Sequence, residues 1–520
     1  MRKPLRTIGT FSFIFFVLCA AYWPALSHQY VHHDDINFFL KTSSSRTILA
    51  FDANLFIGRP LGALRLTAYS SFIHQISDLT IFRFISVIFF SLSAWLMGLW
   101  LRNYCANKIC AVLATLIIFT LPAFQILVAV VGTCATPIAL LLSIAAAAVA
   151  ARRPLAILLL FASLLIYPPI AMFYWVMAGI EILALGDGSK ERLAKLFFNG
   201  FYTIGLYGLM LLATKPYFAN LTTPGYDPYV MSFDIPGKLR WFIEEPLFNA
   251  LNLWNIFPSR PWAYAVLLFI LTAGVIRLFK LYGELKNDVL DLRQLYGRCV
   301  LLALFLLLFL LSSLPGLAAT ANPAFYRCLT GLTGMVMLTI LWSVHTWVGL
   351  FPQKARDNAL PALLAVILVT GTILANRNLY AYRVKPSMVE LRYLEDNLKK
   401  IDIGRLKSVH IIRPDFHGLK FRYDEFGTPT TLYNHNILAV VTCALREINK
   451  EKLVIEDIKY DYDQQLYTYK FRSKVDPAQT FEYVIHISES LKNEPVPAAD
   501  MVIDMNRLYE PDGALDYLRL

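Results

Sequence analysis

Long apolar runs recur along the chain from residue 8 to about residue 375, and then they stop. A helix that crosses a membrane needs about 20 mostly apolar residues, because its backbone groups must bond to one another in lipid. The pattern therefore predicts an α-helical polytopic membrane protein with about eleven transmembrane helices. We place these spans at residues 8–27, 79–101, 109–122, 131–151, 154–167, 169–186, 196–214, 262–282, 298–314, 326–350 and 358–376. Three prolines interrupt the stretch between 109 and 186, so the number of crossings there stays open.

A different pattern begins at residue 377. Polar and apolar residues alternate at 408–412, 452–455, 467–471 and 481–487, which is typical of half-buried strands. Residues 386–401 and 436–450 have helical character. We therefore predict two parts: a transmembrane domain at 1–376, with outside loops 28–78 and 215–261, and a small extracytoplasmic soluble α/β domain at 377–520.

The composition excludes an ordinary soluble enzyme. Apolar residues make up 57% of the chain and charged residues 16%, whereas soluble domains have about 45–50% and about 25%. The net charge is +11, and residues 1–376 carry 27 Lys and Arg against 15 Asp and Glu, while residues 377–520 carry 21 against 22. Because the basic excess lies wholly in the membrane part, it indicates loop orientation, and we expect no nucleic-acid partner.

The basic residues also predict the orientation, since cytoplasmic loops of membrane proteins carry an excess of Lys and Arg. When successive connections are assigned to alternate sides of the membrane, 17 of the 27 basic residues fall in short segments on one side. These segments are 2–6, 102–108, 152–153, 190–195, 277–298 and 354–356. We expect the N-terminus on this cytoplasmic side, and the two long loops and the tail outside. The first run also has features of a cleavable signal peptide ending near Ala25-Leu26-Ser27, but we expect it to be retained. Residue 28 lies outside in either case.

The segment after the first span holds the most informative polar residues, His32-His33-Asp34-Asp35. A carboxylate near the membrane interface is costly unless it is solvated, paired or used. Two interpretations stay open from spacing alone: a functional carboxylate pair, or an aspartate that caps an interfacial helix starting at Ile36.

Four basic residues are candidates for binding a phosphate group: Arg59, Arg65, Lys215 and Arg327. The planar guanidinium of arginine suits a phosphate, since it donates two parallel hydrogen bonds. The alternative is that these side chains reach lipid head groups at the surface, as terminal basic residues of spans commonly do.

Aromatic and acidic residues gather in the second long outside loop. Trp241, Glu244 and Glu245 have the chemistry to hold a sugar ring, by apolar contact with its C–H faces and by accepting bonds from its hydroxyls. We add Tyr326, which opens a late span next to Arg327. An interfacial aromatic belt explains the same composition, and this alternative also stays open.

Taken together, these segments resemble the GT-C class of membrane glycosyltransferases, and more closely the serotype-converting glucosyltransferases that decorate bacterial O-antigen. The resemblance rests on the Asp34-Asp35 pair in the first outside loop, on Gly58 to Leu61 downstream, and on about eleven spans. Ala324 to Arg327 at a late span and Asp424 to Gly427 in the tail add to it. The order of spans and loops agrees along the whole chain, whereas the motifs agree mainly near its N-terminal end.

The resemblance implies transfer of a hexose, expected to be glucosyl, from a polyprenyl-phosphate-linked donor to a hydroxyl of a surface glycan such as O-antigen, a lipopolysaccharide modification. The partners would be this donor, a lipid-linked or surface glycan acceptor, and membrane lipids. The location would be the bacterial plasma (inner) membrane, with the C-terminal domain in the periplasm.

Chemistry assigns roles within that scheme. The attacking hydroxyl must lose its proton, which a nearby carboxylate can accept as general base. Asp34 and Asp35 are both candidates, and one carboxylate is enough for inversion because phosphate is a good leaving group. The four basic residues would stabilise the departing phosphate. No cofactor is certain; a divalent cation, Mg²⁺ or Mn²⁺, at Asp34 and Asp35 stays open, with His32 and His33 beside them.

Other functions stay open as well. A lipid-linked glycan flippase or another transporter would also be polytopic, but it should show charged residues at mid-membrane and two matching halves. We find few of the former and no repeat. An O-antigen polymerase or ligase shares substrates but not the early aspartate pair, and a membrane-anchored sensor would need fewer spans.

Overall fold

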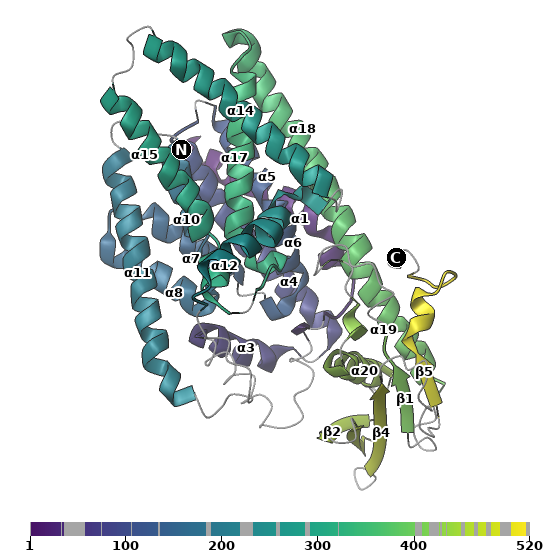
Figure 1. Ribbon diagram of the computed structural model, residues 1–520. Helices are drawn as coiled ribbons and strands as arrows, with labels where there is room; N and C mark the ends of the chain where they lie inside the picture. Colours follow the sequence, from purple (N-terminus) through teal and green to yellow (C-terminus); the bar gives the residue numbers. More distant parts are fainter. Residues whose placement is uncertain are drawn as a thin grey trace.

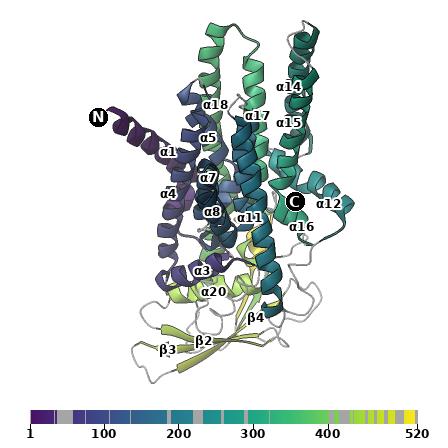
Figure 2. The same cartoon turned by 90° about the vertical axis from the view of Figure 1, so that its left-hand side faces the viewer.

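The computed structural model describes the chain except residues 1, 33, 36–57, 74, 106, 134–135, 184–188, 219–231, 256–259, 287–291, 321, 401–407, 415–425, 427–428, 433, 449–452, 462–465, 475–479, 489–500 and 516–520. For some residues inside described helices and strands, among them Lys215, only the backbone is described. Figures 1 and 2 show a long helical bundle with a small sheet at one end.

Six described helices are long and apolar enough to cross a membrane. They are α1 (Arg2–Ser27), α4 (Ile76–Leu101), α11 (Ser189–Phe218), α14 (Arg260–Lys286), α17 (Thr330–Val348) and α18 (Gln353–Leu379). A seventh span is formed if the bent pair α5 (Lys108–Phe119) and α6 (Pro122–Ala129) is counted as one. The chain is therefore an α-helical protein built to pass through a membrane several times.

The predicted count of eleven is not reached on length. Four further apolar segments occupy predicted positions but are short: α7 (Thr136–Ala148), α8 (Arg153–Ile166), α9 with α10 (Pro168–Ala171 and Tyr174–Leu183), and the stretch Leu295–Leu311 of α15 (Leu292–Leu311). Prolines explain part of this, because Pro168 begins α9 directly after α8 ends and a proline removes a backbone donor.

The break between α5 and α6 is bent by 63°. Pro122 starts α6, and the backbone carbonyl freed at Thr120 accepts a bond from the Gln125 side chain at 2.8 Å. A helix break inside a membrane requires such a replacement partner. Aromatic rings pack around the bend, with Phe119 and Phe124 stacked at 4.9 Å between ring centroids.

Shorter elements connect the spans. They include α3 (Pro60–Phe72), η2 (Val131–Thr133), α12 (Ile235–Phe242), η4 (Ile243–Leu247), α13 (Phe248–Leu251), η5 (Leu253–Asn255), α16 (Leu314–Ala318) and η6 (Tyr326–Cys328). The helix α18 continues through η7 (Tyr380–Val384) into α19 (Lys385–Leu398) without a connecting loop.

The C-terminal unit contains a five-stranded sheet in the order β2-β3-β4-β1-β5. Its strands are β1 (Ser408–Ile412), β2 (Leu453–Asp461), β3 (Leu466–Ser473), β4 (Thr480–Ser488) and β5 (Met501–Asp504), joined by η9 (Thr430–Leu432), α20 (Asn434–Ile448) and η10 (Met505–Tyr509). Strand β1 is parallel to β4 and β5, and the other neighbours are antiparallel. The four predicted strands and two predicted helices all appear here; β5, only four residues long, was not predicted.

A single buried cluster joins the sheet end to the bundle. It contains Leu79 of α4, Val31 and Val131 from two connections, and Leu394 and Val409 from the C-terminal unit. Because these side chains share one core, the C-terminal unit packs directly on the end of the bundle. The segment around residues 30–35 lies at this junction.

Candidate functional site

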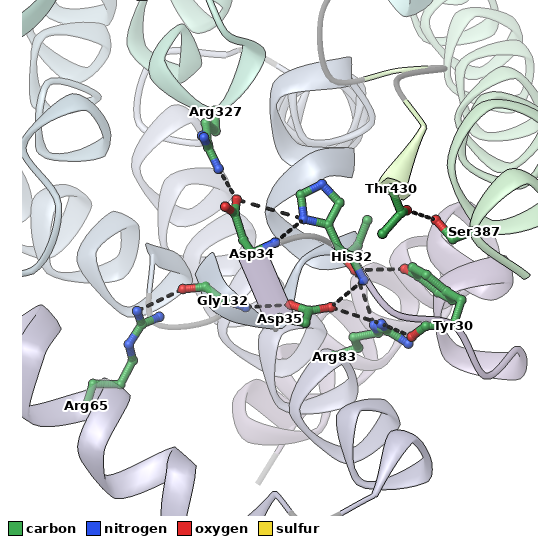
Figure 3. A network of polar contacts seen from close by, with 11 residues as sticks. Tyr30, His32, Asp34, Asp35, Arg65, Arg83, Gly132, Arg327, Ser387 and Thr430 are labelled. Carbon is green, nitrogen blue, oxygen red and sulfur yellow. Dashed lines mark hydrogen bonds and ion pairs between the residues drawn. The ribbon is translucent and has the colours of Figure 1, made fainter. Parts of the chain in front are cut away.

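The segment after α1 is held by an arginine of α4. The Arg83 side chain is fully buried and donates to the backbone oxygens of Tyr30, at 2.9 Å, and Ala129, at 3.2 Å. Its guanidinium also lies 3.7 Å above the ring of Tyr30, whose hydroxyl donates to Ala129 O at 2.8 Å. Figure 3 shows Arg83 and Tyr30 beside Asp35.

Asp35 points into the protein. Its carboxylate is fully buried and accepts hydrogen bonds from the backbone N–H of Gly132, at 2.8 Å, and of His32, at 3.2 Å, with Arg83 Nη2 at 3.4 Å. Burial raises the pKa of Asp35 to about 7, and the charge of Asp34 adds to the rise, while Arg83 and the Gly132 N–H oppose it. The bond to Gly132 holds the segment after α1 against η2, so Asp35 has a structural role.

Asp34 points the other way. Its side chain is 30% exposed and pairs with the Arg327 guanidinium from η6 (Figure 3). Its backbone N–H donates to Nδ1 of His32 at 3.0 Å, so this nitrogen is an unprotonated acceptor. A Cβ on Gly132 would lie 2.7 Å from the backbone oxygen of Asp34, so only glycine permits this close packing. Asp34 is therefore the carboxylate that an incoming group can reach.

Two arginines of the α3 region flank the same place. Arg65 Nη2 donates to Gly132 O at 2.8 Å, so the residue whose N–H binds Asp35 also accepts a bond from Arg65. Its Nε and Nη1 are buried and have no hydrogen-bond partner in the described part of the chain, and the same holds for Nε of Arg59. Within the described residues, these nitrogens are donors that an anion could satisfy.

Arg59 reaches the site over an aromatic ring. Its guanidinium lies 4.4 Å from the ring centroid of Tyr167, and the Tyr167 hydroxyl is 3.5 Å from Sγ of Cys328, the neighbour of Arg327. Gly58 precedes Arg59 with φ +69°, and a Cβ there would clash with Leu211 and Tyr207. Arg327 therefore pairs with Asp34 directly, whereas Arg65 is linked to the same segment through Gly132 and Arg59 is linked to η6 through Tyr167.

The remaining predicted residues have other surroundings. Trp241 Nε1 donates to Glu245 at 2.9 Å, and Glu244 pairs with Arg240 at 2.8 Å, all within α12 and η4. Lys215 lies in α11, but its side chain is outside the described residues, as is all of His33. Tyr326 is buried, and its ring packs on Phe426 of the C-terminal unit.

The described residues do not form a set of ligands for a divalent cation. They contain no group of three His, Cys, Asp or Glu side chains that could hold a metal. Each of the two aspartates already faces a guanidinium, which takes the place that a cation would occupy. The aspartates thus suit a hydrogen-bond donor, such as a hydroxyl, better than a metal.

Sequence reasoning missed four residues of the site: Tyr30, Arg83, Gly132 and Tyr167. Arg83 had a signal, because it is the one charged residue between Leu79 and Leu101 in a predicted span, and such a residue marks a functional or anchoring role by default. Gly132 had none, since its role depends on a segment about a hundred residues away.

Comparison with known proteins adds no name to this site: no family of known proteins, no curated protein and no solved structure matches the chain.

Proposed function

We propose that this protein is a membrane glycosyltransferase that moves a hexose from a polyprenyl-phosphate-linked donor to a glycan hydroxyl. The observation that carries the proposal is the pair of the partly exposed Asp34 with Arg327, with Arg65 bound to the adjoining Gly132 and Arg59 over Tyr167, which contacts Cys328. Such a site supplies both a general base and hydrogen-bond donors that can bind an anion.

Asp34 is the general base in this proposal. The acceptor hydroxyl donates its proton to the Asp34 carboxylate as its oxygen attacks the anomeric carbon, and the bond to the carrier phosphate breaks on the opposite face, which inverts the configuration. Asp35 cannot share this role, because it is fully buried and accepts two backbone bonds. It positions Asp34 instead.

The arginines take the donor phosphate. Arg59, Arg65 and Arg327 carry three positive charges against the one charge of Asp34, and Arg59 and Arg65 hold buried donors without partners among the described residues. As the glycosidic bond breaks, negative charge grows on the phosphate, and donors already in place stabilise it. A phosphate that engages Arg327 also releases Asp34 from its ion pair.

The location fits a lipid-linked donor. We propose that the four shorter apolar segments also lie in the membrane, which restores eleven crossings, and that the sheet end faces the periplasm of a bacterial inner membrane. The donor chain then lies along the spans with its phosphate at α3 and η6. The transferred sugar as glucosyl and the acceptor as O-antigen rest on the family resemblance of the N-terminal motifs.

The test measures hexose transfer by the purified protein and the composition of the surface glycan in cells that produce it. Asp34→Asn should lower transfer from a polyprenyl-phosphate hexose by about 10²–10⁴-fold, since the general base is lost while the shape is kept. Asp512→Asn, at an exposed position of the C-terminal unit, is the matched control and should keep normal transfer. Both are compared at equal protein level, with mass analysis of the glycan.

Normal transfer by Asp34→Asn would overturn the role of Asp34. A wild-type protein that changes the glycan in cells but transfers no sugar when purified would instead support the flippase alternative.

A further inference from the structure

One aromatic contact links the C-terminal unit to the turn that carries Arg327. The Phe426 side chain is fully buried, and its ring meets the Tyr326 ring edge-on, with centroids 5.6 Å apart and planes at 80°. Tyr326 is itself 1% exposed and directly precedes Arg327. Phe426 belongs to the core of the helical bundle, although the chain places it in the C-terminal unit.

The residues after Phe426 are fastened to α19. Glu390, fully buried in that helix, accepts hydrogen bonds from the backbone N–H of Thr430, at 3.1 Å, and Thr431, at 2.9 Å. The hydroxyls of Thr430 and Ser387 lie 3.0 Å apart, a pair that Figure 3 shows. The Tyr509 hydroxyl of η10 donates to the same Glu390 at 2.7 Å. The turn η9 is therefore rigidly seated.

The turn that carries Arg327 has little support of its own. η6 is three residues long, and no side chain caps its start. A 3₁₀ turn of this length is held by its neighbours rather than by its own bonds. The turn packs on α6, α9 and α17 and has Tyr167 against Cys328, and the C-terminal unit adds Phe426 against Tyr326.

We propose that Phe426, seated by η9 and Glu390, is a positioning residue that fixes Tyr326 and thereby holds the Arg327 guanidinium opposite Asp34. The C-terminal unit is then a working part of the site, and a phosphate-bearing ligand binds well only when Phe426 is in place. The ligand half of this inference rests on the proposed function, and the geometric half does not.

The chain offers a matched control for removing the ring. Phe305 in α15 is also buried, and it meets Phe309 edge-on at 5.8 Å and 78°. Phe426→Ala and Phe305→Ala therefore remove the same group from similar contacts, one beside η6 and one in another helix. Phe426→Leu keeps apolar bulk at the site and distinguishes a positioning effect from a failure to fold.

The first measurement needs no ligand. Asp34→Cys and Arg327→Cys are introduced together in a chain whose natural cysteines, Cys328 among them, are replaced by serine. A short bis-methanethiosulfonate reagent joins the two new cysteines, which is detected as a mobility shift on a gel. We expect Phe426→Ala to lower the cross-linked fraction severalfold, and Phe305→Ala and Phe426→Leu to leave most of it. An unchanged fraction in Phe426→Ala would overturn the inference, whatever the ligand data show.

The second measurement uses farnesyl phosphate as the probe and farnesol as its phosphate-free control. With natural residues at 34 and 327, farnesyl phosphate should raise the thermal midpoint, and Phe426→Ala should weaken its affinity about tenfold, while Phe305→Ala should not. If wild-type protein binds both probes equally, the phosphate part of the proposed function fails, and the cross-linking result still decides the positioning role.

Discussion

Asp34 and Asp35 are neighbours in the chain, yet burial gives them different chemistry. Adjacent side chains of an irregular segment point apart, so one carboxylate enters the core and meets Arg83 while the other meets Arg327 at the surface. The sequence alone identified the pair but could not choose between its members. The choice depends on Gly132 and Arg83, which reach Asp35 from distant parts of the chain.

Asp35 predicts a pH dependence of stability. Because burial raises its pKa from 3.8 to about 7, the folded protein binds this proton more tightly than the unfolded chain does. The stabilising contribution of the protonated form is complete below pH 4 and is lost as the pH rises toward 7. Between pH 5 and pH 8 the thermal midpoint of the wild type should therefore fall more steeply than that of Asp35→Asn, by roughly 2–4 °C.

The matched control for this titration is Asp512→Asn, which removes an exposed aspartate. It should reproduce the wild-type slope in the same detergent and buffers. Equal slopes for wild type and Asp35→Asn would show that Asp35 keeps its charge throughout this range, held by Arg83 and the backbone N–H groups.

At the scale of elements, the segment from α12 to η5 packs back on the bundle, where Trp254 of η5 is buried. Trp254 and Asn255 have φ values of 50° and 52°, a left-handed conformation that non-glycine residues rarely adopt. The Trp254 indole donates to Thr120 Oγ1 at 3.0 Å, and Asn378 donates to its backbone oxygen. Such strain persists only where the surroundings fix the residue, so η5 locks the α5–α6 bend to α18.

This lock predicts opposite effects for two glycine substitutions. A Cβ on Gly371 of α18 would lie 2.7 Å from the Trp254 indole, whereas one on Gly274 of α14 meets nothing within 4 Å. Gly371→Ala should lower the free energy of unfolding by about 1–3 kcal/mol through overpacking. Gly274→Ala should raise it by about 0.5–1 kcal/mol, since alanine is the better helix former. Thermal midpoints in detergent measure both, and a rise in each would show that Trp254 moves aside freely.

The apolar pattern located the helices well because spans follow from local composition. Residues 8–27, 79–101 and 358–376 were predicted, and α1, α4 and α18 cover them. It could not show the returning segment α12 to η5, where apolar and polar residues alternate irregularly. The ends of α7 and α8 also escaped prediction, because a span that is shorter than the membrane still reads as an apolar run.

At the scale of the whole molecule, the site exists only because distant segments meet. Arg327 and Asp34 are 293 residues apart in the chain, and one buried cluster joins α4 to the C-terminal unit. Residue type and position in the sequence made Asp34, Arg59, Arg65 and Arg327 candidates for the site. Their convergence, and the part of Phe426 in it, depend on tertiary packing that no local pattern encodes.

The two ends of the molecule predict its orientation. The turn between α17 and α18 lies at the end of the bundle opposite to the sheet (Figures 1 and 2), and the basic residues Lys354 and Arg356 follow that turn. Since basic loops stay in the cytoplasm, the sheet and the aspartates should face outside. Single cysteines at Phe351 and Asp512, both exposed positions, and a membrane-impermeant maleimide measure this against the parent chain. Asp512→Cys should gain label in intact spheroplasts and Phe351→Cys only after lysis, because the bundle separates the two ends. The reverse pattern, with label on Phe351→Cys in intact spheroplasts and on Asp512→Cys only after lysis, would place the site on the wrong side for a lipid-linked donor.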